Sequence, residues 1–234
     1  MRTITNYKLI KRNKRIGQIA TFTSLGVLAA GLIISFQNDP ALLTWSMAAL
    51  LVGFIISQVG IYYTTRWGRS PRPDEKLNQS LKGLENKFTL YNYSSPVPHL
   101  LLGPAGVWII HPYYQAGTIT YDTTKKRWRQ NGGNIYLKIF AQENLGRPDL
   151  EIESSRADLE KFIARQLPEI SNIKINTILA FTNEKAIIDA ADAPVPTLPA
   201  AKLKDFFRKK TKDGRVADNY IENLQKKLPE EDQL

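Results

Sequence analysis

Two long apolar stretches lie near the start of the chain, with a short polar joint between them. Ile16–Gln37 and Leu42–Tyr63 each run for 22 residues without a charged side chain. At a helical rise of about 1.5 Å per residue, each is about 33 Å long and matches a hydrocarbon core of roughly 30 Å. Pro40 in the joint prevents one continuous helix. The pattern predicts a transmembrane helical hairpin over residues 16–63.

Small residues recur every four positions in both apolar stretches, at Gly26 and Ala30 in the first and at Ala49, Gly53 and Ser57 in the second. Such ladders let helices approach closely. We expect them to pack the two helices of the hairpin together, and dimerisation is the alternative. A signal peptide is the competing interpretation of the first stretch, but its end, SFQ, is a poor cleavage site.

After residue 72 the pattern changes to short alternating or apolar runs between helical stripes. Leu77, Leu81 and Leu84 form one apolar stripe and predict a helix over 73–87. Gly103–Gly106 has strong turn chemistry and predicts a β-hairpin between its flanking strands. Further strands are expected over 88–93, 99–102, 107–110, 117–122, 173–181 and, at a sheet edge, 195–198, and further helices over 149–167, 200–210 and 216–228. This order predicts a layered α/β domain with a mixed sheet over 73–234.

Charge is distributed unevenly between these parts. Residues 1–72 carry nine of the 32 Lys and Arg residues and one of the 22 acids, so 23 basic and 21 acidic residues remain in 73–234. The basic excess flanks the apolar stretches, in a basic N-terminus (1–15) and a linker (64–72). The positive-inside rule then predicts an integral membrane protein with both termini in the cytoplasm. The nearly balanced α/β domain does not favour nucleic acid as a partner.

The residue types available restrict the chemistry further. The chain has no cysteine, which excludes disulfides, thiol nucleophiles and cysteine metal sites. Its only histidines are His99 and His111, so a zinc site would need carboxylates to complete it. With a two- or four-residue turn in the β-hairpin, His99 pairs with Ile110 and Pro98 with His111. Adjacent pairs point to opposite faces of a sheet, so the histidines should not share a ligand.

Several segments, taken in order, resemble a known family. The run VPHLLLGPAGVWII over Val97–Ile110 is the most specific of them. It follows a helix that opens with Asp74-Glu75-Lys76 and precedes GTI at 117–119, Trp128, Arg147-Pro148 and ILAF at 178–181. Residues 73–210, roughly 60% of the chain, resemble the NERD (nuclease-related) domain. The resemblance implies a PD-(D/E)XK nuclease-like fold.

The resemblance also implies where the catalytic residues would lie. The family's acid falls on Pro98, its glutamate on His111 and its lysine on Tyr113, and only the helix glutamate, Glu75, is retained. Magnesium prefers several carboxylate ligands, and metal-assisted phosphodiester cleavage depends on that ion. We therefore predict no bound metal, no cofactor and no nuclease activity. The alternative is an active metal-dependent nuclease in which Glu75 acts with displaced ligands, Asp122 or Glu143.

Two groups of residues remain as candidate binding sites. The positions of the lost site, Glu75, His111 and Tyr113, with Gln115 beside them, form the first. The basic run Lys125, Lys126, Arg127 and Arg129 forms the second, where contact with an anion is set against an ordinary solvated loop. The sequence thus predicts a membrane-anchored binding or scaffold module whose partners are the lipid bilayer and either another protein or a second copy of the chain.

Overall fold

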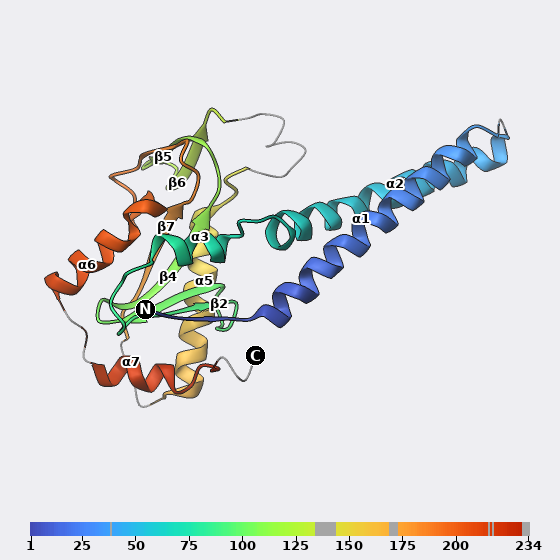
Figure 1. Ribbon diagram of the computed structural model, residues 1–234. Helices are drawn as coiled ribbons and strands as arrows, with labels where there is room; N and C mark the ends of the chain where they lie inside the picture. The colour runs from blue at the N-terminus through green and yellow to red at the C-terminus, as the bar shows by residue number, and fades with distance from the viewer. Residues whose placement is uncertain (38, 134–143, 169–172, 215, 217, 231–234) are drawn as a thin grey trace. The chain divides into compact units, whose positions relative to one another are not determined.

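The computed structural model describes residues 1–37, 39–133, 144–168, 173–214, 216 and 218–230. The chain divides into two compact units (Figure 1). One is the continuous segment Tyr7–Arg72. The other joins Met1–Asn6 to Pro73–Leu234.

The continuous unit is a helical hairpin. Helix α1 (Tyr7–Ser35) and helix α2 (Pro40–Tyr63) are followed by a π-helical turn, η1 (Thr64–Gly68). Asp39 begins α2, because its carboxylate accepts a hydrogen bond of 2.8 Å from the Ala41 N–H, and Pro40 follows it. Both helices are long and apolar enough to cross a membrane, and only 17% and 11% of their most apolar windows are buried. A core helix of a water-soluble domain would be mostly buried.

Small residues form the contact between α1 and α2. A Cβ atom added at Gly53 would lie 2.7 Å from Leu28 Cγ, and one added at Gly31 would lie 3.1 Å from the Ala49 side chain. Beside them the Ser46 hydroxyl donates a hydrogen bond of 2.8 Å to the Gly31 carbonyl. The prediction that small residues pack the hairpin together is therefore confirmed for Ala49 and Gly53. It is wrong for Gly26, where an added Cβ would meet nothing within 4 Å.

The other unit contains a six-stranded mixed sheet. Its strand order is β1-β2-β3-β4-β7-β9, with β1–β2, β4–β7 and β7–β9 parallel and the remaining pairs antiparallel. The bounds are β1 Arg2–Thr5, β2 Thr89–Asn92, β3 His99–Gly103, β4 Gly106–Tyr113, β7 Ile175–Phe181 and β9 Thr197–Pro199. The sequence prediction is confirmed for β2, β3, β4 and β7, and for β9 as an edge strand.

A second, three-stranded sheet has the order β6-β5-β8. Its strands are β5 (Gly117–Asp122), β6 (Arg127–Asn131) and β8 (Ala186–Asp189). The pattern predicted β5, but it did not predict β8 or the division into two sheets. Ile119 and Trp128 of this sheet share a buried cluster with Tyr113, Leu179 and Phe181 of the larger sheet.

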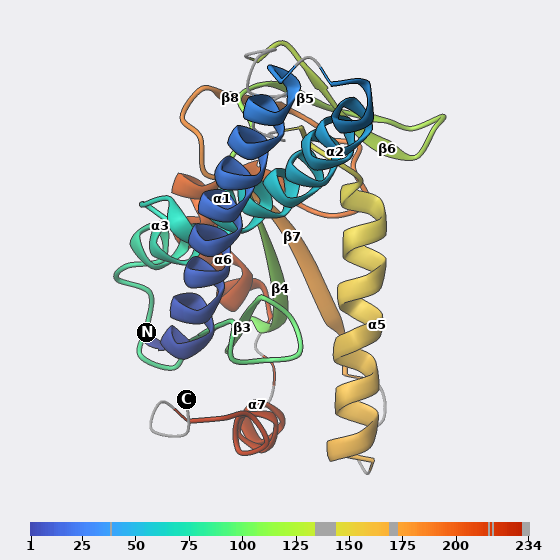
Figure 2. The same cartoon turned by 90° about the vertical axis from the view of Figure 1, so that its right-hand side faces the viewer.

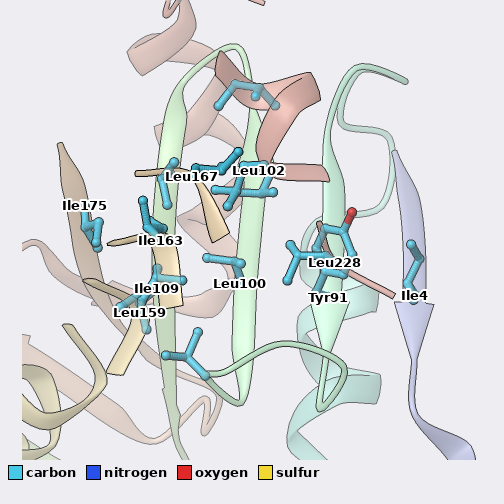
Figure 3. Close-up of a cluster of buried hydrophobic side chains, with 14 residues drawn as sticks. Ile4, Tyr91, Leu100, Leu102, Ile109, Leu159, Ile163, Leu167, Ile175 and Leu228 are labelled. Atoms are coloured by element: carbon cyan, nitrogen blue, oxygen red, sulfur yellow. The ribbon is translucent and has the colours of Figure 1, made fainter. Parts of the chain in front are cut away.

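Helices cover both faces of the six-stranded sheet (Figures 1 and 2). Helix α3 (Pro73–Ser80) and helix α6 (Leu203–Asp213), which follows the short helix η2 (Ala200–Lys202), pack on one face with Leu101, Trp108 and Ile110. Helix α5 (Pro148–Gln166) and helix α7 (Asp218–Gln225) pack on the other. Figure 3 shows Leu100 and Ile109 beside Leu159 and Ile163 in this second cluster.

Strand β1 is the main departure from the predicted organisation, in which 1–15 was a basic cytoplasmic tail. Thr3 pairs with Leu90 of β2, and Ile4 is only 2% exposed within the core. The predicted helix over 73–87 is also shorter, since α3 ends at Ser80 and Gly83 adopts a φ of 83°, but Leu77, Leu81 and Leu84 are buried as expected.

Candidate functional site

The β3–β4 hairpin sets the geometry of the site that the family resemblance predicts. Gly103 pairs with Gly106, and Leu100 pairs with Ile109, so the turn has two residues. Gly106 has a φ of 100°, a conformation that suits glycine. The register is the predicted one. It places His99 on the α3 face, where its Nδ1 lies 2.9 Å from Asn92 Oδ1 and Asn92 in turn donates to Asn78 of α3.

His111 and Tyr113 point to the opposite face, the one covered by α5. Ile109 packs with α5, and residues two and four positions later in a strand share its face. Tyr113 donates a hydrogen bond of 2.6 Å from its hydroxyl to Glu151 Oε2 of α5, and its ring stacks on Phe181 at 5.4 Å between centroids. Tyr113, the position to which the resemblance assigns a lysine, is thus a buried tyrosine that is anchored to a helix.

Glu75 lies on α3, which covers the other face of the sheet. The next residue, Lys76, donates to the Thr182 carbonyl over 3.3 Å and lies 4.1 Å from the ring centroid of Tyr114. Burial lowers the pKa of Lys76, an effect that the nearby Glu184 carboxylate opposes. The start of α3 therefore lies beside the C-terminal ends of β4 and β7, while His111 and Tyr113 point to the α5 face.

Pro98 and Gln115 flank the two strands of this hairpin. Pro98 immediately precedes β3, and its carbonyl accepts a hydrogen bond of 2.7 Å from the Tyr93 N–H. Gln115 follows β4, and its side-chain amide donates to the Asn144 carbonyl over 3.0 Å. Proline supplies no side-chain ligand for a cation at the position to which the resemblance assigns an acid.

The carboxylates of the described residues do not gather into a metal-binding group. Within 1–37, 39–133, 144–168, 173–214, 216 and 218–230, no cluster of three or more His, Asp or Glu side chains could hold a metal ion. Asp122, one of the displaced ligands considered, accepts hydrogen bonds from the Lys125 and Thr124 N–H groups and pairs with Arg129 at 2.8 Å. These contacts, the Lys125 N–H first, lower the pKa of Asp122. Glu143, the other, lies outside the described residues.

The basic run spans the turn between β5 and β6 and the first residues of β6. Lys125 and Lys126 are exposed, and Lys126 adopts a φ of 48°. Arg127 and Arg129 alternate with Trp128, whose indole N–H donates to Thr197 Oγ1 over 3.1 Å. Asp122 pairs with Arg129 of β6, so the net positive charge of the basic run is smaller than the run alone indicated.

A cavity that the sequence did not predict lies at the other end of β4 and β7. Its volume is about 580 Å³, and its lining includes Trp108, Lys174, Asn176, Lys210 and Tyr220. These side chains come from β4, from β7 and the residue before it, and from α6 and α7, so no local motif marks the site. The volume is within the range of small-molecule sites, about 300–1,000 Å³.

No protein-family model, curated protein or solved structure matches this chain. The resemblance to the nuclease-related family therefore rests on the residues of the chain itself.

Proposed function

We propose that the protein is a membrane-anchored binding or scaffold module whose cytoplasmic α/β domain lacks nuclease activity. The anchor is the α1–α2 hairpin. Large apolar side chains cover its outer surface, with exposed fractions of 74% for Phe22, 70% for Trp45 and 57% for Phe54. In water such a surface would cost about 25 cal/mol per Å², whereas a bilayer solvates it and both helices satisfy their own backbone hydrogen bonds.

The path of the chain supports a hairpin with both ends on one side of the membrane. Strand β1 precedes the hairpin and β2 follows it, yet the two strands pair within one sheet. Residues 1–6 and 73–234 must then share a compartment. The positive-inside rule assigns that compartment to the cytoplasm, since the joint between the helices has no Lys or Arg.

One observation carries the proposed loss of nuclease activity: the short hydrogen bond between Tyr113 and Glu151. Tyr113 stands at the lysine position of the resembled family, and its phenol, which donates to Glu151, is held against α5. Pro98 and His111 stand at the two acid positions, so the carboxylates that would bind a catalytic cation are replaced. Phosphodiester hydrolysis of the metal-assisted kind would lack both its ion and its cationic side chain.

The test uses the full chain purified in a mild detergent. It is incubated with single- and double-stranded DNA and RNA in the presence of Mg²⁺ or Mn²⁺, and we expect no cleavage. Cleavage that Glu75→Gln abolishes would contradict the proposal and favour the displaced-ligand nuclease. Cleavage that survives both Glu75→Gln and a second purification step would also contradict the proposal, whereas cleavage that the second purification removes belongs to a contaminating enzyme.

The anchoring and scaffold parts are tested separately. Alkaline carbonate should leave the protein in the membrane pellet, and its release into the supernatant would contradict membrane anchoring. Sedimentation of the detergent-solubilised chain distinguishes a monomer, which favours binding of another partner, from an oligomer, which favours self-association.

A further inference from the structure

We propose that the hairpin carries a binding site for anionic phospholipid head groups at its base, an inference that rests on the proposed membrane anchoring. The site is a cation cluster made of Lys8, Lys11, Arg12, Lys14, Arg15 and Arg66. All six side chains are exposed. Five come from the first part of α1 and the sixth comes from η1.

Helix α1 arranges the five cations as a rigid array. The helix starts at Tyr7, nine residues before the apolar stretch, so the basic segment continues the spanning helix without a break. Successive residues of an α-helix are rotated by about 100° around its axis, so these five side chains lie within an arc of about 160° around α1. The buried positions Ile10, Asn13 and Gly17 lie on the other side of the helix. The array therefore presents one positively charged face at the level where the apolar stretch begins.

The close approach of the two helices brings Arg66 to the same level. A Cβ atom added at Gly17 would lie 3.0 Å from both the Thr64 backbone nitrogen and Tyr63 Cβ. Arg66 follows Thr64 by two residues and lies 5.9 Å from the ring centroid of Trp67. Arg15 precedes Gly17 by two residues. The exposed Tyr62, at the end of α2, and the cationic side chains suit the interface between acyl chains and head groups.

Nothing within the hairpin neutralises this charge. The one acidic residue among 7–72 is Asp39, which lies in the joint at the far end and caps α2. The first turn of α1 contains no acid, and cations there are opposed by the helix dipole. The array thus does not serve the stability of its own helix. A phosphate group would compensate the side-chain charges of the array.

Lipid is the occupant that the position of the cluster favours. The cations adjoin a helix pair whose exposed side chains are apolar, so the nearest phosphates are those of the bilayer in which the hairpin is inserted. Each Lys or Arg near an anionic surface contributes about fivefold to association. Three of them together should contribute about a hundredfold at low salt.

The experiment reconstitutes the full chain in phosphatidylcholine vesicles and adds phosphatidylglycerol or phosphatidylcholine spin-labelled on the acyl chain. Electron paramagnetic resonance then gives the association constant of one lipid relative to the other. We expect a preference for phosphatidylglycerol of at least about tenfold at low salt, falling at high salt. The variant K11Q/R12Q/K14Q should lose most of it. The matched variant K202Q/K209Q/K212Q, with three exposed cations removed from 73–234, should keep it.

Each outcome decides between the alternatives. An unmodified chain without preference for the anionic lipid, or a preference that survives K11Q/R12Q/K14Q, would overturn the inference. Loss in both triple variants would show a general charge effect and would also overturn it. Inorganic phosphate at equal ionic strength should not compete, and competition would assign the site to a free anion instead. Release by alkaline carbonate would refute the anchoring itself, whereas stable insertion without lipid preference would refute only the lipid site.

Discussion

Replacing Gly103 by alanine should destabilise the α/β domain, because the core has no room for a side chain at this position. Gly103 ends β3 and lies against the ring of Phe88. An added Cβ would be under 3 Å from three carbons of that ring, including 2.8 Å from Cε1 and Cγ, whereas carbon atoms pack best at about 3.5–4.0 Å. Phe88 is 1% exposed and packs against Phe207, with 6.4 Å between ring centroids, so the ring cannot easily move away.

The magnitude follows from two opposing effects. Overpacking of a well-filled core costs about 1–3 kcal/mol, and this clash with a fixed ring belongs in the upper half of that range. Replacing glycine by alanine also lowers the conformational entropy of the unfolded chain, which stabilises the folded state by about 0.4–1 kcal/mol. We therefore expect the free energy of unfolding to fall by about 2 kcal/mol.

Urea unfolding of the full chain in detergent, followed by tryptophan fluorescence, measures this change. With a slope of about 2 kcal/mol per M, the midpoint should fall by about 1 M while the slope stays the same. Gly214→Ala is the matched control, because an added Cβ there meets nothing within 4 Å and its φ of 179° is extended. The control should stay within about 0.5 kcal/mol. A Gly103→Ala midpoint equal to that of the control would refute the packing argument.

Three other perturbations test separate parts of the structure. Tyr113→Phe should lower the free energy of unfolding by about 1–2 kcal/mol, because it removes the hydrogen bond to Glu151 and keeps the stacked ring. If the double variant Tyr113→Phe/Glu151→Gln is little less stable than Tyr113→Phe alone, the pair is confirmed. If the stability losses of the two single variants add in the double variant, the pair is contradicted. Ile4→Ala should cost about 2–4 kcal/mol if β1 belongs to the core, and an effect below about 0.5 kcal/mol would show that it does not. Burial raises the pKa of Tyr91 to about 12, so the protonated phenol is favoured in the folded state. The contribution of Tyr91 to the free energy of unfolding is complete below pH 10 and is lost as the pH rises from 10 to 12. Tyr91→Phe should therefore flatten the profile of stability against pH between pH 10 and 12. A profile that Tyr91→Phe leaves unchanged would contradict the raised pKa of Tyr91.

The sequence predicted the elements whose signal is local. The apolar stretches predicted α1 and α2, and the turn chemistry of Gly103–Gly106 predicted the β-hairpin with its register. Strand β1 escaped prediction because its four residues, RTIT, lack a distinctive pattern and become a strand only by pairing with β2. Strand β8 is equally short and depends on β5 in the same way.

The candidate site was predictable by position but not by contact. Alternation along β4 placed Ile110 and His111 on opposite faces, as the sequence implied. It could not show that Tyr113 meets Glu151, since the two residues lie 38 positions apart and are joined by the packing of α5 on the sheet. The cavity beside Trp108 was missed for the same reason, because its lining residues converge only in three dimensions.

The position of β1 ahead of the hairpin also governs how the protein can be made and divided. During synthesis Thr5 must wait until Asn92, 87 residues later, has left the ribosome before the two side chains can form their hydrogen bond. Both apolar helices are complete by then, so the α1–α2 hairpin can form before the sheet closes. A recombinant fragment starting at Pro73 would leave the β2 edge uncovered and prone to aggregate. A soluble version should instead join Asn6 to Pro73 through a short flexible linker, which keeps the edge strand and removes only the hairpin.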